Sequence, residues 1–122
     1  MPLNLLTTID WQISAVETTG WNVSSSLAFN PAGQPSIAYS NSSFELRFAT
    51  QNADRTWAIG TVDTGLQNSG HPSLAFRLGQ PAISYQWQQY ASGQPGSYPR
   101  TQLRYALLRG TLWDINAVHA EF

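Results

Sequence analysis

The sequence lacks cysteine and lysine, and it has little charge of either sign. Without cysteine among its 122 residues, the chain has no disulfide framework, no thiolate metal site and no cysteine nucleophile, and its compartment stays open. Charged residues make up only 11% of the chain, where about 25% is usual. The formal net charge is -1, so the basic surface typical of nucleic-acid binding is missing. We therefore expect no nucleic-acid partner.

Long apolar segments are also missing. The first ten residues, MPLNLLTTID, contain no positive segment followed by an apolar run, so they predict neither a signal peptide nor a membrane span. Hydrophobic residues nevertheless make up 42% of the chain, which is too many for a disordered protein. A chain of 122 residues encloses one modest core. These features predict a single domain, or a piece of one, with no membrane partner.

The main feature of the sequence is internal repetition. Four phrases recur in the same order: S-L-A-F at 26–29 and 73–76, P-x-I-x-Y at 35–39 and 81–85, L-R-[FY]-A at 46–49 and 103–106, and W-x-I-x-[AT]-V at 11–16, 57–62 and 113–118. A faint further copy of the third phrase covers residues 3–6. A Gly-Gln-Pro turn joins the first phrase to the second in both repeats. Such ordered recurrence indicates a repeat architecture.

Each phrase predicts a short β-strand, and nothing predicts a helix. The phrases alternate with a period of two residues between clusters of Gly, Pro, Asn and Ser. Large and small side chains also alternate, as in Leu27, Ala28 and Phe29, which is expected where both faces of a sheet are covered. Four-stranded sheets that repeat about every 40 to 50 residues are typical of β-propeller blades. An ordinary β-sandwich is the alternative.

These phrases also resemble a known family. Segments such as SLAFNPAGQPSIAY and ELRFAT, followed by W-x-I-x-x-V, are similar to the blades of bacterial β-propeller repeat proteins. The turn at residues 50–57 resembles a degenerate Asp-box of sialidase-like propellers, although Asn52 stands where Asp is usual and Asp54 where Gly is usual. The resemblance implies an all-β fold of propeller-type blades, each with four antiparallel strands.

Two and a half blades are expected from one chain. Residues 1–20 would form a leading half blade from a third and a fourth strand, 21–65 a first full blade, and 66–122 a second one with an expanded loop at 87–100. A closed ring needs about four to eight blades. We therefore expect copies of the chain to complete the ring as a homo-oligomer, the alternative being a fragment or partner of a longer propeller.

The candidate ligand-binding residues lie in loops that are not repeated. Antiparallel strands place these loops at one end of the sheets, opposite the Gly-Gln-Pro turns, and function tends to reside in such departures from a scaffold. Aromatic rings stack on sugars, while amides and Arg bond to hydroxyls. The candidate residues are Trp21, Asn22, His71, Trp87, Gln88, Tyr90, Tyr98 and Arg100. Capping of a blade or contact between subunits is the alternative role for the aromatic residues.

The repeated residues favour structural roles. Trp11, Trp57 and Trp113 recur in register and are expected to pack blades. Arg47 and Arg104 are expected to find a charge partner or a backbone contact within the blade, with ligand binding as the alternative. No catalytic motif, phosphate loop or dinucleotide fingerprint occurs, and the histidines lack ligand spacing for a metal. We expect no enzyme, cofactor or metal. The favoured function is a lectin-like carbohydrate-binding module; the alternatives are a structural or protein-interaction propeller fragment and, third, a degenerate glycosidase-like domain.

Overall fold

The computed structural model describes residues 10–21, 23–90 and 100–121, and the regular structure in these ranges is entirely β-strand. The strands are β1 (Ser25–Phe29), β2 (Pro35–Ser40), β3 (Glu45–Gln51), β4 (Trp57–Thr64), β5 (Ser73–Arg77), β6 (Gln80–Gln89), β7 (Arg100–Arg109) and β8 (Leu112–Glu121). They form two four-stranded sheets, β1-β2-β3-β4 and β5-β6-β7-β8, in which all neighbours are antiparallel. The expected all-β class and the eight strands of the two repeats are confirmed.

Local sequence explains the tight turns between the first two strands of each sheet. Gly33 and Gly79 both have a left-handed backbone, with φ of 80° and 82°, which glycine adopts without steric cost. The sequence between the first two phrases is one residue shorter in the second repeat, and there Arg77 pairs directly with Gln80. Leu78 therefore also takes a positive φ of 49°, which makes a two-residue hairpin loop of the twisted kind that matches the strands.

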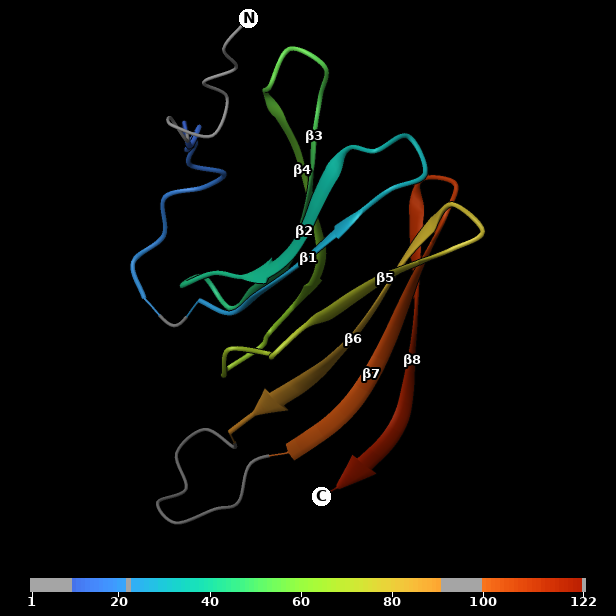
Figure 1. Ribbon diagram of the computed structural model, residues 1–122. Helices are drawn as coiled ribbons and strands as arrows, with labels where there is room; N and C mark the ends of the chain where they lie inside the picture. The colour runs from blue at the N-terminus through green and yellow to red at the C-terminus, as the bar shows by residue number, and fades with distance from the viewer. Residues whose placement is uncertain (1–9, 22, 91–99, 122) are drawn as a thin grey trace, which may run out of the picture.

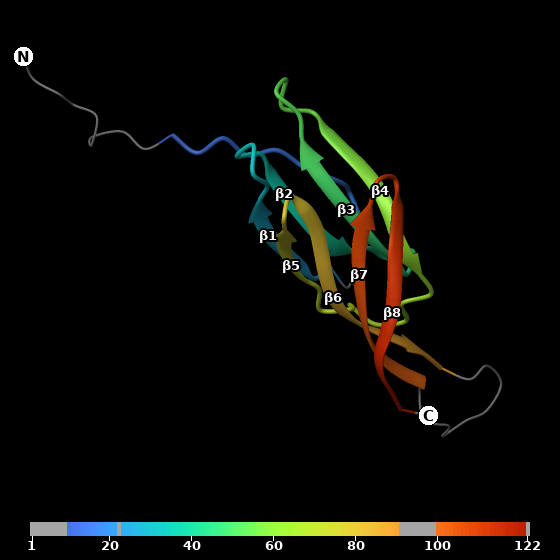
Figure 2. The same cartoon turned by 90° about the vertical axis from the view of Figure 1, so that its right-hand side faces the viewer.

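The core lies between the two sheets. Figures 1 and 2 show the sheets side by side, with β5 packed against β1 and β2. The first sheet contributes Ala38 and Leu46, both 0% exposed, and the second contributes Ile83, also 0% exposed, and Tyr85 at 1%. Large side chains of the second sheet thus pack on a surface of the first sheet where small ones such as Ala28 and Ala38 predominate. The alternation of large and small side chains therefore suits this one interface, whereas the expected cover on both faces of each sheet is only partly present, since Leu27 and Leu103 are exposed.

The outward face of each sheet is open in part. Leu74 is 7% exposed in the core, but Leu27, which holds the same position in the first repeat, is 59% exposed, and Phe29 beside it is 62% exposed. Leu46 is 0% exposed, but its repeat-equivalent Leu103 is 47% exposed. Each outward face therefore carries residues that are buried in the other repeat.

The structure differs from the expected leading half blade. Residues 10–20 form no strand, and Trp11 is 82% exposed, so it packs no blade. A strand requires a neighbour that satisfies its backbone N–H and C=O groups, and no described strand pairs with this segment. The other half of the expected pair, residues 1–9, lies outside the described residues. At residues 11–16 the pattern W-x-I-x-x-V therefore specifies neither a strand nor a buried contact, since Trp11 and Ile13 are both exposed.

Two further expectations change in the second sheet. Trp87 to Gln89 and Arg100 belong to β6 and β7 rather than to a loop over 87–100; residues 91–99 lie outside the described ranges. Trp113 fulfils the packing role expected of the repeated tryptophans, since its ring meets Phe48 of the first sheet edge-on at 5.5 Å between centroids.

Candidate functional site

The strand order separates a turn end from a loop end. The turn end comprises the connections at 30–34, 52–56, 78–79 and 110–111, in the upper part of Figure 1. The loop end comprises the connections at 41–44 and 65–72, together with Trp21, which precedes β1, and Tyr90, which follows β6. The connection between β4 and β5 lies in the lower part of Figure 1. This separation agrees with the expectation drawn from the alternation of the strands. Two groups of polar side chains, described next, connect the segments near the loop end to the two sheets.

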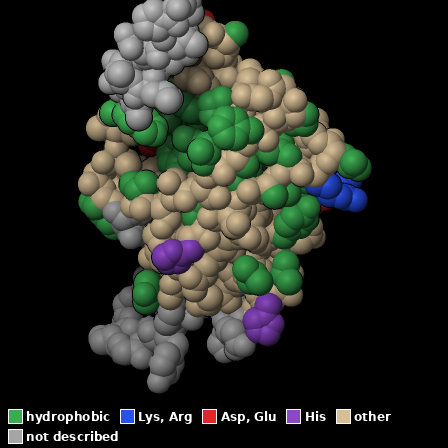
Figure 3. All heavy atoms as spheres, viewed as in Figure 1, with side chains coloured by type: hydrophobic (Ala, Val, Ile, Leu, Met, Phe, Trp, Pro, Cys, Tyr) green, Lys and Arg blue, Asp and Glu red, His purple; other side chains and the backbone are tan. Residues whose placement is uncertain are grey.

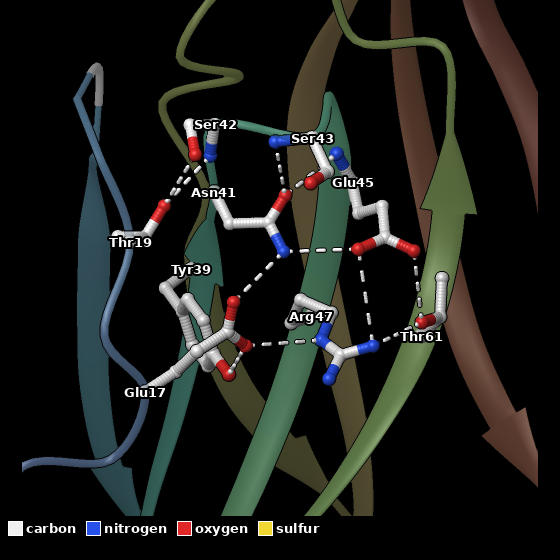
Figure 4. A network of polar contacts seen from close by, with 9 residues as sticks. All are labelled: Glu17, Thr19, Tyr39, Asn41, Ser42, Ser43, Glu45, Arg47 and Thr61. Atoms are coloured by element: carbon white, nitrogen blue, oxygen red, sulfur yellow. Dashed lines mark hydrogen bonds and ion pairs between the residues drawn. The ribbon is translucent and has the colours of Figure 1, made fainter.

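The first polar group, which we call the Glu17 cluster, surrounds a carboxylate from the leading segment (Figure 4). The Tyr39 hydroxyl donates to Glu17 Oε1 at 2.7 Å, and Arg47 Nε donates to the same oxygen at 3.3 Å. Asn41 Nδ2 donates both to Glu17 at 3.1 Å and to Glu45 at 3.0 Å. Tyr39 and Asn41 are only 5% and 6% exposed. The cluster therefore fixes residue 17 against the outward face of the first sheet.

The second group, the Asp63 cluster, repeats this arrangement between the two sheets. The Tyr85 hydroxyl donates to Asp63 Oδ2 at 2.6 Å, and Arg104 Nη1 donates to the same oxygen at 2.8 Å. The Arg104 guanidinium also lies 4.1 Å from the centroid of the Trp87 ring, a favourable cation–π distance. Arg47 and Arg104 therefore have charge partners as expected. Arg47 pairs within its own sheet, where Glu45 Oε1 lies 3.9 Å from its Nη1, whereas Glu17 and Asp63 come from the preceding copy of the repeated phrase.

Burial and hydrogen bonding fix the protonation states in both clusters. Burial, together with the hydrogen bond to Glu17, raises the pKa of Tyr39 to about 12. Burial also raises the pKa of Tyr85, and the carboxylate of Asp63 adds to that shift. For Glu17, burial acts to raise the pKa, but the hydrogen bonds from Tyr39 and Asn41 and the charge of Arg47 outweigh it and lower the pKa. At neutral pH the tyrosines are therefore protonated and Glu17 is ionised, as suits a lasting structural contact.

Alkaline pH should weaken the fold through Tyr39. An unfolded tyrosine ionises near pH 10, but Tyr39 retains its proton up to about 12, so the free energy of unfolding should fall as pH rises from about 10 through about 12. Denaturant titrations at stepped pH should show a smaller fall in Tyr39→Phe than in the wild type. Leu78→Ala, which lies outside both clusters at a site that is 94% exposed, is the control and should keep the wild-type slope. Equal slopes in all three proteins would contradict this account.

Exposed aromatic rings gather at the loop end. Trp21 is 58% exposed and meets Phe44, 37% exposed, edge-on at 6.1 Å between centroids. Tyr90 is 54% exposed on the second sheet. The connection at 65–72 joins the two sites, since Leu66 N–H donates to Phe44 O at 3.0 Å and Tyr90 N–H donates to the Gln67 side chain. Sequence reasoning missed Phe44 and Gln67, although both stand in loops that the repeat does not preserve.

The other candidate residues have different surroundings. Trp87 is only partly exposed, and its Nε1–H donates to Thr64 O at 3.1 Å, so it forms part of the contact between the sheets. Gln88 Oε1 accepts from Asn68 at 2.8 Å. His71 is exposed with a positive φ of 43°, and Ser69 Oγ lies 2.9 Å from its Nε2. Arg100 is exposed at the start of β7. Asn22 and Tyr98 lie outside the described residues.

Two surface hollows lie away from these rings. One of about 430 Å³ lies between residues 12–14, Gln51 and Arg55, and another of about 320 Å³ opens between the sheets beside Phe48 and Trp113. Both border the turn end, whereas the sequence argument expected ligand contacts at the loop end. In Figure 3 the two histidine side chains stand exposed on the lower part of the viewed face. Trp21, Phe44 and Tyr90 line neither of the two hollows, and all three rings are exposed.

The comparisons with known proteins add no identity. No family model, no curated protein and no solved structure matches the chain. Among the described residues, no group of three or more His, Asp or Glu side chains is placed to hold a metal ion. The described residues also contain no helix long and apolar enough to cross a membrane.

Proposed function

We propose that the protein is a non-catalytic carbohydrate-binding module that presents its ligand surface at the loop end. The observation that carries this proposal is the exposure of Trp21, Phe44 and Tyr90 on one end of the sheets, with backbone hydrogen bonds fixing the loops between them. Aromatic rings on a fixed backbone lose little conformational freedom on binding. Their apolar faces suit the C–H faces of a sugar ring.

Polar side chains beside the rings support the same ligand class. Gln67 is exposed, and Asn68 and Gln88 are partly exposed next to it. An amide offers both donors and an acceptor, so it matches a sugar hydroxyl in either sense. Because the surface is open rather than enclosed, we expect weak binding at a single site. Several such sites in one assembly would add avidity.

We further propose that the two sheets are blades of a propeller-type ring that more sheets complete. Support comes from the meander order of both sheets and from the two repeat-equivalent clusters, in which an acid of one repeat bonds to Tyr and Arg of the next. Support also comes from the open outward faces, because exposed apolar surface of this kind marks interaction sites. Copies of the chain are the proposed source of the remaining sheets.

Substitution of the exposed rings should test the carbohydrate proposal. On a glycan array, and then by titration of the best glycan, Trp21→Ala and Tyr90→Ala should each weaken binding about tenfold, because each removes a stacking ring. Leu78→Ala is the matched control, since Leu78 is 94% exposed at the turn end and its loss should leave binding unchanged. An array without any bound glycan, or equal binding by all variants, would refute the proposal.

A structural or protein-interaction module is the second candidate, and one observation favours it. Leu27 and Phe29 stand 59% and 62% exposed on an outward face whose repeat-equivalent is buried. Under this alternative, the exposed face is the functional surface and the aromatic rings of the loop end contribute to contacts between proteins. A chain that self-associates but binds no glycan would support it.

A further inference from the structure

We propose that the outward face of the first sheet is the docking site for the second sheet of another copy, and that residues 10–20 hold part of this site and restrain the association. The inference rests on the propeller-type assembly proposed above. It adds which two faces meet and which segment of the chain restrains their association. We call the outward face of the first sheet, with Leu27, Phe29 and Ile37, the large-residue face. We call the outward face of the second sheet, with Ser73, Ala75 and Leu103, the small-residue face.

The contact inside the chain supplies the geometry for this docking. There, the inward face of the first sheet, with Ser26, Ala28 and Leu46, receives Leu74 and Ile83 of the second sheet. Ser26 Oγ accepts from Leu74 N–H at 3.1 Å. Ser73, Ala75 and Leu103 of the small-residue face are the repeat-equivalents of Ser26, Ala28 and Leu46. Leu27 and Ile37 of the large-residue face are the repeat-equivalents of Leu74 and Ile83. Two copies placed head to tail would therefore form the same contact between chains.

Exposure shows that part of each face has no partner within one chain. Leu27 is 59% exposed, whereas Leu74 is 7% exposed; Leu103 is 47% exposed, whereas Leu46 is 0% exposed. Ser73, the equivalent of Ser26, is also exposed. A head-to-tail contact does not pair a surface with itself, so it continues to add copies, and a ring forms where the rotation from one copy to the next closes.

The leading segment lies where the outer strand of the incoming sheet would lie. Glu17 bonds to Tyr39 and Arg47 as Asp63 of β4 bonds to Tyr85 and Arg104. Residues 12–14 lie beside Gln51 and Arg55 of the first sheet. Their repeat-equivalents, residues 58–60 of β4, lie in the same way beside Leu108 and Trp113 of the second sheet. An incoming β8 would replace this segment, because β8 is the repeat-equivalent of β4.

The charges favour the segment over the incoming strand. Residue 119 holds the position of Glu17 and Asp63 in the third copy of the phrase, but it is His119. A docking copy would therefore bring an imidazole to Tyr39 and Arg47, where Glu17 brings a carboxylate. Asn41 Nδ2 also donates to Glu17, at 3.1 Å, and it donates to Glu45 as well. Tyr39, Arg47, Asn41 and Glu45 are thus the polar and charged groups around the Glu17 carboxylate. We infer that Glu17 restrains association by holding the segment in place.

Moving the carboxylate from the segment to the incoming strand should release this restraint. In sedimentation equilibrium, the dissociation constant for self-association should be at least about tenfold lower in the full-length Glu17→Ala/His119→Asp variant than in the wild type. Adding Leu27→Asp should abolish the gain, because it places a charge on the large-residue face. An unchanged constant, or a gain that Leu27→Asp leaves intact, would overturn the proposal.

Because Glu17→Ala removes a partner of the buried Tyr39, a second experiment leaves Glu17 in place. The chain has no native cysteine, so Leu27→Cys/Ser73→Cys should form disulfide-linked ladders under mild oxidation, with a higher yield when His119→Asp is added. Ala53→Cys/Ser73→Cys, with one cysteine on the exposed β3–β4 turn, is the control. Equal yields from the two pairs, or an unchanged yield with His119→Asp, would overturn the docking geometry. Glycan binding by the unlinked proteins reports separately on the carbohydrate proposal.

Discussion

Leu74→Ala is expected to lower the free energy of unfolding by about 2–5 kcal/mol, the usual cost of truncating a large buried aliphatic side chain. Leu74 is 7% exposed within the core between the two sheets. A loss of this size is a large part of the stability of a small domain. Urea unfolding followed by tryptophan fluorescence measures it.

Leu27→Ala is the matched control for this prediction. Leu27 has the same residue type and the same position in the repeat, but it is 59% exposed, so its truncation should cost less than about 1 kcal/mol. The measurement belongs at low protein concentration, because a docked second copy would bury Leu27 and raise its cost. Equal losses at low concentration would show that the core is not confined to the space between the two sheets.

Asp63→Ala should have the second large effect, a loss of about 2–3 kcal/mol. It removes the acceptor of two hydrogen bonds, at 2.6 Å from the Tyr85 hydroxyl and at 2.8 Å from Arg104. Tyr85 is 1% exposed, so water cannot readily replace the lost partner, and an unpaired buried group is costly. The side chains of Asp63 and Arg104 are 14% and 19% exposed, which keeps the expected cost below that of a fully buried pair.

Asp114→Ala provides the comparison for a charge pair in solvent. Asp114 bonds to Arg109 at 3.3 Å, but the side chains are 50% and 64% exposed. Such surface pairs contribute about 0–1 kcal/mol, so this variant should unfold close to the wild type. Similar losses in Asp63→Ala and Asp114→Ala would mean that the Asp63 cluster does not hold the sheets together.

The strands could be predicted from the sequence because each phrase is short, alternating and bounded by turn residues. The phrase W-x-I-x-[AT]-V occurs three times. Its copies at 57–62 and 113–118 form β-strands, but its copy at 11–16 does not. The difference is the neighbour: β4 pairs with β3 and β8 with β7, whereas the leading copy has no described strand beside it. A local pattern specifies which side chains suit a surface, and pairing depends on the rest of the fold.

The candidate site was harder to predict because exposure depends on the other sheet. Trp21 and Trp87 each occur once, outside the repeats, and sequence alone gave no means of telling them apart. Trp87 follows Tyr85 along β6, so it faces the first sheet and meets Arg104, while Trp21 precedes β1 and contacts the turn at Phe44. Only the placement of the two sheets shows that Trp87 packs between them and that Trp21 stays exposed.

The placement of the acids has a consequence for how such repeats can be added or removed. A unit cut at the sheet boundary, from residue 25 to 64, would carry Asp63 without its partners and would leave its own Tyr39 and Arg47 without Glu17. A unit cut just before each acid, from residue 17 to 62, carries one acid together with the Tyr and Arg that bond to it. Duplication or deletion in that frame leaves every such contact intact. The genetic unit that can change in number is therefore offset from the structural sheet by one acid and the connection that follows it.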